Sequence, residues 1–116
     1  MEIVMKEVGA VVVLHLKGRL DLASGAGLKD EVKALLDKEK NLLHLNLAEV
    51  DFINSSGLGV LVSVMKEARL HKGRLTLSNL AAYVQEIFEI TQLSHIFEIF
   101  STEAEALDSY QSVNAD

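Results

Sequence analysis

Two adjacent serines in the stretch DFINSSGLGV are the residues best placed for chemistry. Ser55 and Ser56 stand where an apolar run ends and a helix-like pattern begins, so either hydroxyl could accept from the unpaired first N–H groups of a helix. Gly57 and Gly59 follow in the same turn, where glycine costs roughly 1 kcal/mol relative to alanine. Glycine lets another backbone or a phosphoryl donor approach closely, and a helix N-terminus stabilises phosphate. The turn is therefore suited to receiving phosphate, while helix capping by a serine stays open.

Serine hydrolase chemistry finds little support in this sequence. Neither serine has a glycine two positions before it, as the Gly-x-Ser-x-Gly elbow requires, and no histidine is visibly placed to act as general base. The stretch GAGLKD, residues 25–30, resembles a phosphate-binding loop, but it does not directly follow a strand and lacks a lysine followed by serine or threonine. We therefore expect no catalytic residues and no enzymatic activity.

The histidines and the absent cysteines argue against a metal site. His15, His44, His71 and His95 are scattered, and none stands three or four residues from another, as ligands on one helix face would. The sequence has no cysteine, which excludes disulfides and thiolate ligands. We expect neither a metal nor another cofactor, and structural roles suffice for all four histidines.

The helix that follows the serines is predicted from the spacing of its apolar residues. Leu58, Leu61, Val62, Met65 and Ala68 recur on one stripe, which is typical of a helix packed on a core. This stripe places the predicted helix at about residues 56–71 and leaves the other residues of the segment outside the core.

Strands and helices alternate along the rest of the chain. The apolar pattern predicts strands at 2–8, 10–17, 41–47, 74–79 and 96–100, and helices at 24–38, 56–71, 82–90 and 102–110. Ser24 is expected to cap the first helix. Each strand-helix-strand crossover implies parallel neighbours, whereas the first two strands pair as a hairpin at Gly9. The predicted fold class is α/β: one domain over 1–110, with a mixed β-sheet packed by about four helices, and a tail at 111–116 that can fray.

Composition and charge narrow the environment and the partners. The chain has 116 residues, of which 49% are hydrophobic and 24% charged, as expected for one folded domain. Its net charge of −6 and its lack of a basic cluster argue against nucleic acid. No apolar run approaches the roughly 20 residues of a membrane span, and no secretory signal pattern opens the chain. We therefore expect a cytoplasmic protein with no membrane contact.

Several stretches resemble STAS domains, and among them the bacterial anti-sigma-factor antagonists of the sporulation and stress-response type. GRLDLAS resembles the family's Gly-x-Leu-Asp motif after the second strand, and VDFINSSGLGVLV resembles its Asp-Ser-Ser-Gly-Leu-Gly signature. GRLTLSNLAAYVQEIFEITQLSHIFEIF follows the family's pattern of strand, helix, T-x-L turn and final strand. The resemblance covers nearly the whole chain.

The resemblance implies a protein that switches between partners. In that family the unmodified antagonist binds an anti-sigma factor that is also a serine kinase of the histidine-kinase-like ATPase fold, and so frees a sigma factor. The kinase phosphorylates the serine directly before the first signature glycine, and a PP2C-type phosphatase restores the antagonist. Carried onto this chain, the phosphoacceptor is Ser56.

The surroundings of the acceptor also follow from the resemblance. Asp21 matches an acidic residue that lies near the acceptor in the family, and Ser55, Gly57, Leu58 and Gly59 complete the turn.

Asn54 departs from the family pattern, because its position is often Asp. An amide can orient the Ser56 hydroxyl but cannot accept its proton as a base. We therefore expect phosphorylation to be slower, or to depend on Asp21 and on the kinase's own groups.

The expected docking surface combines the turn at 55–59 with the face of the helix outside the core stripe. That face is predicted to carry Val60, Ser63, Val64 and Glu67, with the two valines as an apolar contact patch. We expect a monomer or a weak dimer. The alternative function is a STAS adaptor subunit of a lipid-transport ATPase or a signalling assembly, which would bind its partner without phosphate turnover.

Overall fold

A mixed five-stranded sheet forms the centre of the protein, as the sequence predicts. The computed structural model describes the backbone of residues 1–114 and the side chains up to residue 111. Its elements, in chain order, are β1 (Glu2–Val8), β2 (Val11–Leu20), α1 (Leu22–Asp37), β3 (Leu42–Ile53), α2 (Ser55–Leu70), β4 (Arg74–Ser78), α3 (Ala82–Ile90), the 3-10 helix η1 (Leu93–His95), β5 (Glu98–Phe100) and α4 (Glu103–Asn114). The strands lie in the order β1-β2-β3-β4-β5. Only β1 is antiparallel to its neighbour, so the predicted hairpin and parallel crossovers are confirmed.

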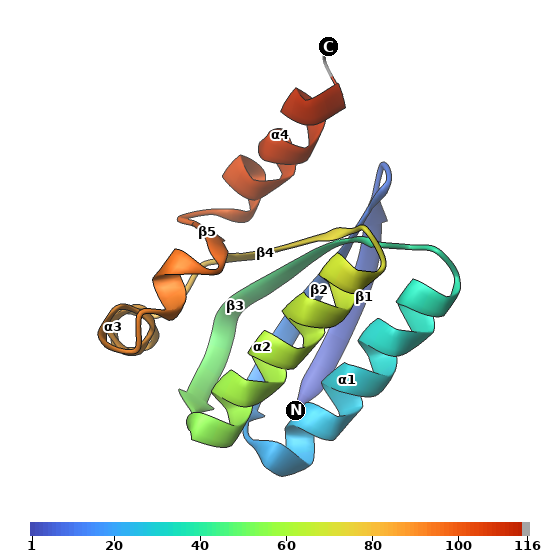
Figure 1. Cartoon of the computed structure of the whole chain (residues 1–116). Coiled ribbons are helices and arrows are strands. Elements are labelled where there is room, and N and C mark those ends of the chain that lie inside the picture. Colours follow the sequence, from blue (N-terminus) through green and yellow to red (C-terminus); the bar gives the residue numbers. More distant parts are fainter. Residues whose placement is uncertain (115–116) are drawn as a thin grey trace.

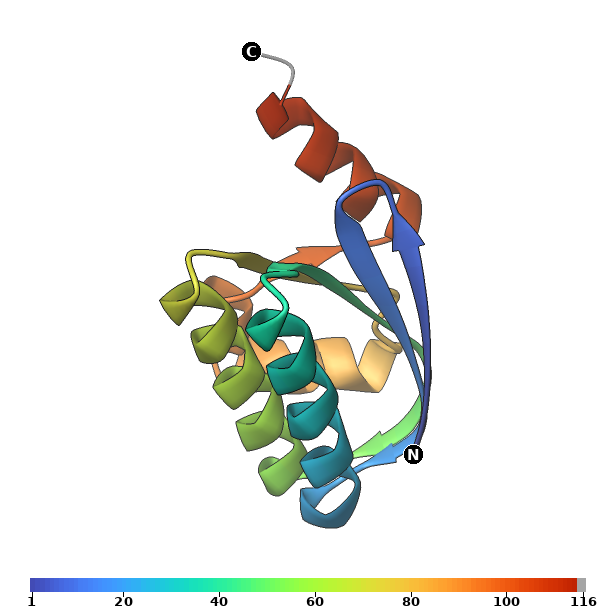
Figure 2. The same cartoon turned by 90° about the vertical axis from the view of Figure 1, so that its right-hand side faces the viewer.

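One face of the sheet carries the main hydrophobic core. Leu14, Leu45 and Leu77 stand side by side on β2, β3 and β4 and are fully buried. Helices α1 and α2 lie next to each other over this face (Figures 1 and 2), and Phe88 of α3 joins the same core. Because β2 and β3 are parallel neighbours, the two helices that follow them begin at the same end of the sheet.

The opposite face is partly polar and is packed by α4. Tyr110 of α4 joins Val11 and Val13 in a small second cluster. His44 of β3 is the cross-strand neighbour of Val13, and its ring nitrogens are 2.7 Å from the hydroxyl oxygens of Thr76 and Ser78. All three of these polar side chains are fully buried.

Several element boundaries differ from the prediction. Strands β2 and β3 run three and six residues further than predicted, to Leu20 and Ile53, and β5 begins at Glu98 instead of residue 96. Helix α1 begins at Leu22 with Asp21 as its N-cap, so the expectation that Ser24 caps it is wrong. The two residues form a capping box, in which the Asp21 side chain accepts from the Ser24 N–H and the Ser24 hydroxyl accepts from the Asp21 N–H, each at 3.0 Å. Helix α2 begins one residue earlier than predicted, and α4 runs to Asn114. Residues 115–116 of the expected tail lie outside the described part of the chain.

Candidate functional site

Asn54, the residue after β3, organises the first turn of α2. Its backbone is extended (φ −116°, ψ −175°), and its side-chain oxygen accepts a hydrogen bond of 2.9 Å from the Gly57 N–H. Its carbonyl accepts the first helical bond, from Leu58, also at 2.9 Å. The N-cap is therefore Asn54, and neither serine caps the helix. The amide oxygen that could have oriented the Ser56 hydroxyl instead accepts the hydrogen bond of the cap.

Ser55 and Ser56 occupy the first two positions of α2, and both are exposed. Within the described part of the chain, neither hydroxyl makes a hydrogen bond. The N–H groups at these positions have no intrahelical acceptor, and the helix dipole places partial positive charge at this end. The turn therefore combines an uncommitted hydroxyl with backbone donors that suit an anion.

The two glycines of the turn differ in how closely other atoms approach them. A Cβ on Gly57 would lie 2.1 Å from the carbonyl oxygen of Leu20, so only glycine lets α2 approach the end of β2 this closely. A Cβ on Gly59 would meet nothing within 4 Å, and Gly59 is exposed. Packing thus explains Gly57 but leaves Gly59 free for a role at the surface.

Asp21 follows β2 just as Asn54 follows β3. The last residues of the two strands, Leu20 and Ile53, are partners, so Asp21 and Asn54 lie at the same end of the sheet. The Asn54 N–H also donates to the Leu20 carbonyl, at 3.4 Å. Hydrogen bonds from the Ser24 backbone and side chain lower the pKa of Asp21, with a smaller contribution from Arg19. Asp21 is therefore an ionised carboxylate at the end of the sheet where α2 begins.

The prediction that two valines form an exposed contact patch on α2 is wrong. Val60 and Val64 are each only 2% exposed and belong to the main core. Val60 packs directly on α1, where a Cβ on Gly25 would come within 2.4 Å of its Cγ2. Since α2 contacts both the sheet and α1, its buried arc is wider than the stripe seen in the sequence.

Ser63 and Glu67 remain on the accessible side of α2, as predicted. They line a groove of about 320 Å³ between α1 and α2. Lysines from α1 and a histidine from the end of α2 also line it, namely Lys29, Lys33 and His71. Of the predicted docking surface, the exposed turn and this mixed-charge groove between the two helices are accessible.

Arg19 is a residue of this region that the sequence reasoning missed. Its guanidinium lies 3.9 Å from the centre of the Phe52 ring, and its Nε lies 3.8 Å from Asp21 Oδ2. Its side chain is 62% exposed. The signal was present in the GRLD motif, where Arg19 stands two residues before the acidic position.

The buried His44 and Ser78 have the contact expected of a base and a nucleophile, at 2.7 Å. Both are fully buried, however, and burial lowers the pKa of His44 to about 4, the larger effect against the opposing charge of Glu103. A substrate has no access to this pair, so its role is structural.

The side chains described, up to residue 111, include no group of three or more His, Cys, Asp or Glu residues that could hold a metal ion. None of the helices within residues 1–114 is both long enough and apolar enough to cross a membrane.

The sequence is similar to those of known proteins over most of its length. The sequence profile of the STAS domain matches residues 2–106. The chain is similar to the anti-sigma-B factor antagonist of Listeria monocytogenes, at 34% identity over 92 residues, which are 79% of this chain and 81% of that one.

Solved structures show the same fold. The crystal structure of TM1081 from Thermotoga maritima has a TM-score of 0.86 and 29% identity, and the match covers 92% of each chain. SpoIIAA from Bacillus in its phosphorylated form has a TM-score of 0.74 over 94% of this chain and 99% of its own, but at 23% identity it supports the fold alone. From the profile match over almost the whole described length, the chain belongs to the STAS domain family.

Proposed function

We propose that this protein is an anti-sigma-factor antagonist that binds an anti-sigma factor with serine kinase activity, and that phosphorylation of Ser56 ends the binding. A PP2C-type phosphatase would restore the binding form, and the exchange would take place in the cytoplasm. The observation that carries the proposal is the exposed, unbonded Ser56 hydroxyl at the start of α2. The function named for the Listeria relative supports the partner class. STAS antagonists are generally non-enzymatic, which fits a binding role.

Phosphorylation would act on the interface and leave the fold intact. A phosphoserine adds about −1.5 to −2 charges, and at a helix N-terminus it is stabilising by roughly 0.3 to 1 kcal/mol. The same charge buried unpaired against a partner costs several kcal/mol, and each 1.4 kcal/mol is tenfold in affinity. The ionised Asp21 adds negative charge at the same end of the sheet. The switch is therefore a local electrostatic block to docking.

The proton of the Ser56 hydroxyl needs an acceptor during phosphoryl transfer. The Asn54 amide cannot accept it, and its oxygen is already bonded to the Gly57 N–H. The Asp21 carboxylate is ionised but accepts two hydrogen bonds from Ser24 at Oδ1, at 3.0 and 3.1 Å. We infer that the kinase supplies the base and that Asn54 only shapes the turn.

Titration calorimetry with the cognate anti-sigma factor tests the switch. Ser56→Ala should bind like the unmodified protein, whereas Ser56→Asp should bind at least roughly tenfold more weakly, because it places a charge in the interface. Ser55→Ala is the matched control for the identity of the acceptor: incubation with the kinase and ATP should still end its binding. Equal affinities of Ser56→Ala and Ser56→Asp would refute the switch.

Incubation with the kinase and ATP separates the antagonist from an adaptor. Intact mass measurement should show one added phosphate on the natural sequence and none on Ser56→Ala. An unchanged mass of the natural protein, together with partner binding, would favour a STAS adaptor that works without phosphate turnover.

A further inference from the structure

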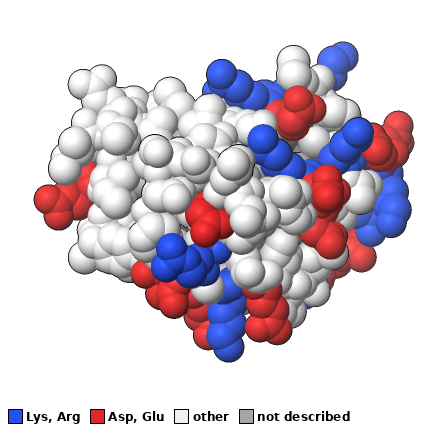
Figure 3. Space-filling model, turned by 90° about the horizontal axis from the view of Figure 1, so that it is seen from below, with Lys and Arg blue, Asp and Glu red and all other residues white. Residues whose placement is uncertain are grey.

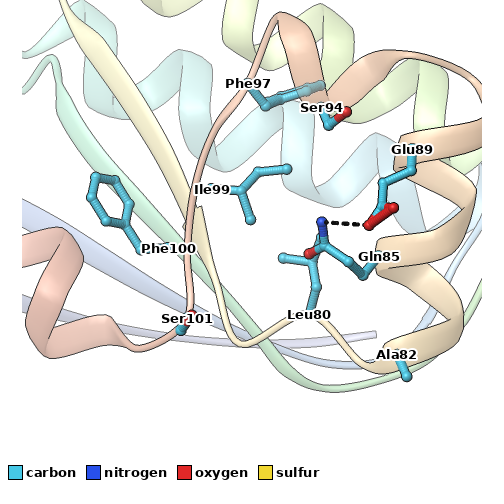
Figure 4. Close-up of a pocket in the computed structure, with 9 residues that line it drawn as sticks. All are labelled: Leu80, Ala82, Gln85, Glu89, Ser94, Phe97, Ile99, Phe100 and Ser101. Atoms are coloured by element: carbon cyan, nitrogen blue, oxygen red, sulfur yellow. Dashed lines mark hydrogen bonds between the residues drawn. The ribbon is translucent and has the colours of Figure 1, made fainter.

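A second groove lies at the far edge of the sheet, between α3 and β5. It has a volume of about 770 Å³ and is lined by Leu80, Ala82, Gln85, Glu89, Ser94, Phe97, Ile99, Phe100 and Ser101. Figure 4 shows the Ile99 side chain reaching from β5 towards α3, above Leu80, while Gln85 and Glu89 form the opposite wall. The floor is therefore apolar and one wall is acidic. A groove of this size and lining is typical of sites that receive a ligand or a partner's side chains.

The acidic wall is poorly neutralised by the protein itself. Among the described residues, the Glu89 carboxylate has one hydrogen bond, from the Gln85 amide at a long 3.5 Å. No lysine or arginine follows Arg74 in the sequence, whereas acidic residues continue to the end of the chain. Two arginines reach this region without pairing with Glu89 among the described contacts: Arg74 pairs with Glu98 at 2.7 Å, and Arg69 donates to the Ile96 carbonyl at 2.9 Å.

Apolar side chains are also exposed outside the groove lining. Tyr83 and Ile90 of α3 are 42% and 73% exposed, and Ile96, just before β5, is 39% exposed. Figure 3 shows acidic groups and no basic group at the left of the view, the side on which Figure 1 places α3. Within the groove, the apolar floor of Leu80 and Ile99 and the poorly neutralised carboxylate of Glu89 are complementary to a segment that is both apolar and basic.

We propose that the groove between α3 and β5 is a second docking site for the anti-sigma factor, and that it receives a segment with an apolar side chain next to a lysine or arginine. The apolar side chain packs on Leu80 and Ile99, and the cation pairs with Glu89. This inference rests on the proposed function but concerns elements that do not include the Ser56 turn. It makes docking bivalent: one contact is switched by phosphate, and the other adds affinity that alone does not keep the partner bound once Ser56 is phosphorylated.

Charge reversal and groove filling test the site by calorimetry with the purified cognate anti-sigma factor. Glu89→Lys removes the pairing charge, and Ala82→Trp fills the groove from an exposed position. Each should weaken binding roughly tenfold, the size expected for one well-placed contact. Glu2→Lys is the matched control, because it makes the same charge change at an exposed residue of β1, the opposite edge strand. It should change the affinity less than twofold, and urea unfolding should show that all three variants are folded.

The outcomes separate this inference from the proposed function. If Glu89→Lys and Ala82→Trp both bound the anti-sigma factor with the affinity of the natural protein, the second site would be overturned. Weaker binding by Ser56→Asp in the same titrations would still support the phosphorylation switch. No binding by the unmodified natural protein would overturn both. Sedimentation of the free protein gives a further check: self-association that disappears in Glu89→Lys would identify a second copy as the occupant and overturn the proposed partner.

Discussion

Gly57 and Gly59 show how much the sequence can say about single residues. Their low helix propensity predicted that something other than helix formation keeps them in the turn, and the packing confirms this for Gly57. The sequence could not distinguish the two, because the carbonyl that excludes a side chain at Gly57 belongs to Leu20, far earlier in the chain. Only the packing of α2 on the end of β2 assigns one glycine to the fold and the other to the surface.

Substituting each glycine by alanine should therefore have opposite effects. Gly57→Ala would place a methyl group against the Leu20 carbonyl and should lower the free energy of unfolding by roughly 1–3 kcal/mol. Gly59→Ala meets open space and should raise it by roughly 0.4–1 kcal/mol, since the unfolded chain loses freedom and the helix gains propensity. Urea denaturation of the two variants measures both changes. Similar stabilities for both would contradict the close approach.

At the scale of elements, the order and type of every predicted strand and helix were confirmed, whereas the outward face of α2 was not. Apolar periodicity reports that a helix packs on something, but it does not report how many neighbours the helix has. Val60 and Val64 lie outside the main stripe and are nevertheless buried, because α1 runs alongside α2. The accessible surface of α2 consequently excludes both valines, while Ser63 is half-buried and Glu67 is exposed.

The N-cap of α2 provides a prediction at this scale. Asn54→Ala removes the acceptor of the Gly57 N–H and should lower the free energy of unfolding by about 1 kcal/mol. Asn54→Asp keeps the acceptor and adds a negative charge at the helix N-terminus, so it should be at least as stable as the natural protein. Ser55→Ala, one residue later and unbonded, is the control and should stay within roughly 0.5 kcal/mol in urea. If the urea midpoint of Asn54→Ala equalled that of the natural protein, the cap would not stabilise the turn.

At the scale of the whole molecule, the crossover rule and the hairpin predicted the sheet, but not what packs on its second face. Glu103 of α4 contacts Lys6 at 3.1 Å, His15 at 2.8 Å and Asn46 at 3.0 Å, and these partners come from three different strands. Tyr110 bonds to Thr76 at 2.9 Å, and burial raises its pKa to about 12. Such polar contacts between distant segments leave no periodic signal in the sequence. They make the second face a polar layer that holds α4 in one place.

The buried His44 should make the stability of the whole fold depend on pH. Burial lowers its pKa from the ordinary 6.5 to about 4. Between pH 4 and pH 6.5 this histidine is therefore protonated in the unfolded chain but neutral in the folded protein. The contribution to stability is complete above about pH 6.5 and is lost as the pH falls towards 4. By this linkage the free energy of unfolding should drop by about 2 kcal/mol between pH 7 and pH 5.

Urea denaturation at the two pH values, with His44→Gln and the surface control His71→Gln, measures this dependence. His44→Gln should be less stable at pH 7, because it disturbs the bonds to Thr76 and Ser78, but it should lose much less stability on going to pH 5. His71 is exposed, so His71→Gln should keep the natural pH dependence. Carboxylates contribute little in this window, since the pKa values of Asp21, Glu98 and Glu103 are all lowered from values already below 5. An unchanged pH dependence in His44→Gln would show that the histidine is not held neutral beneath α4, and that another group governs the response of the fold to acid.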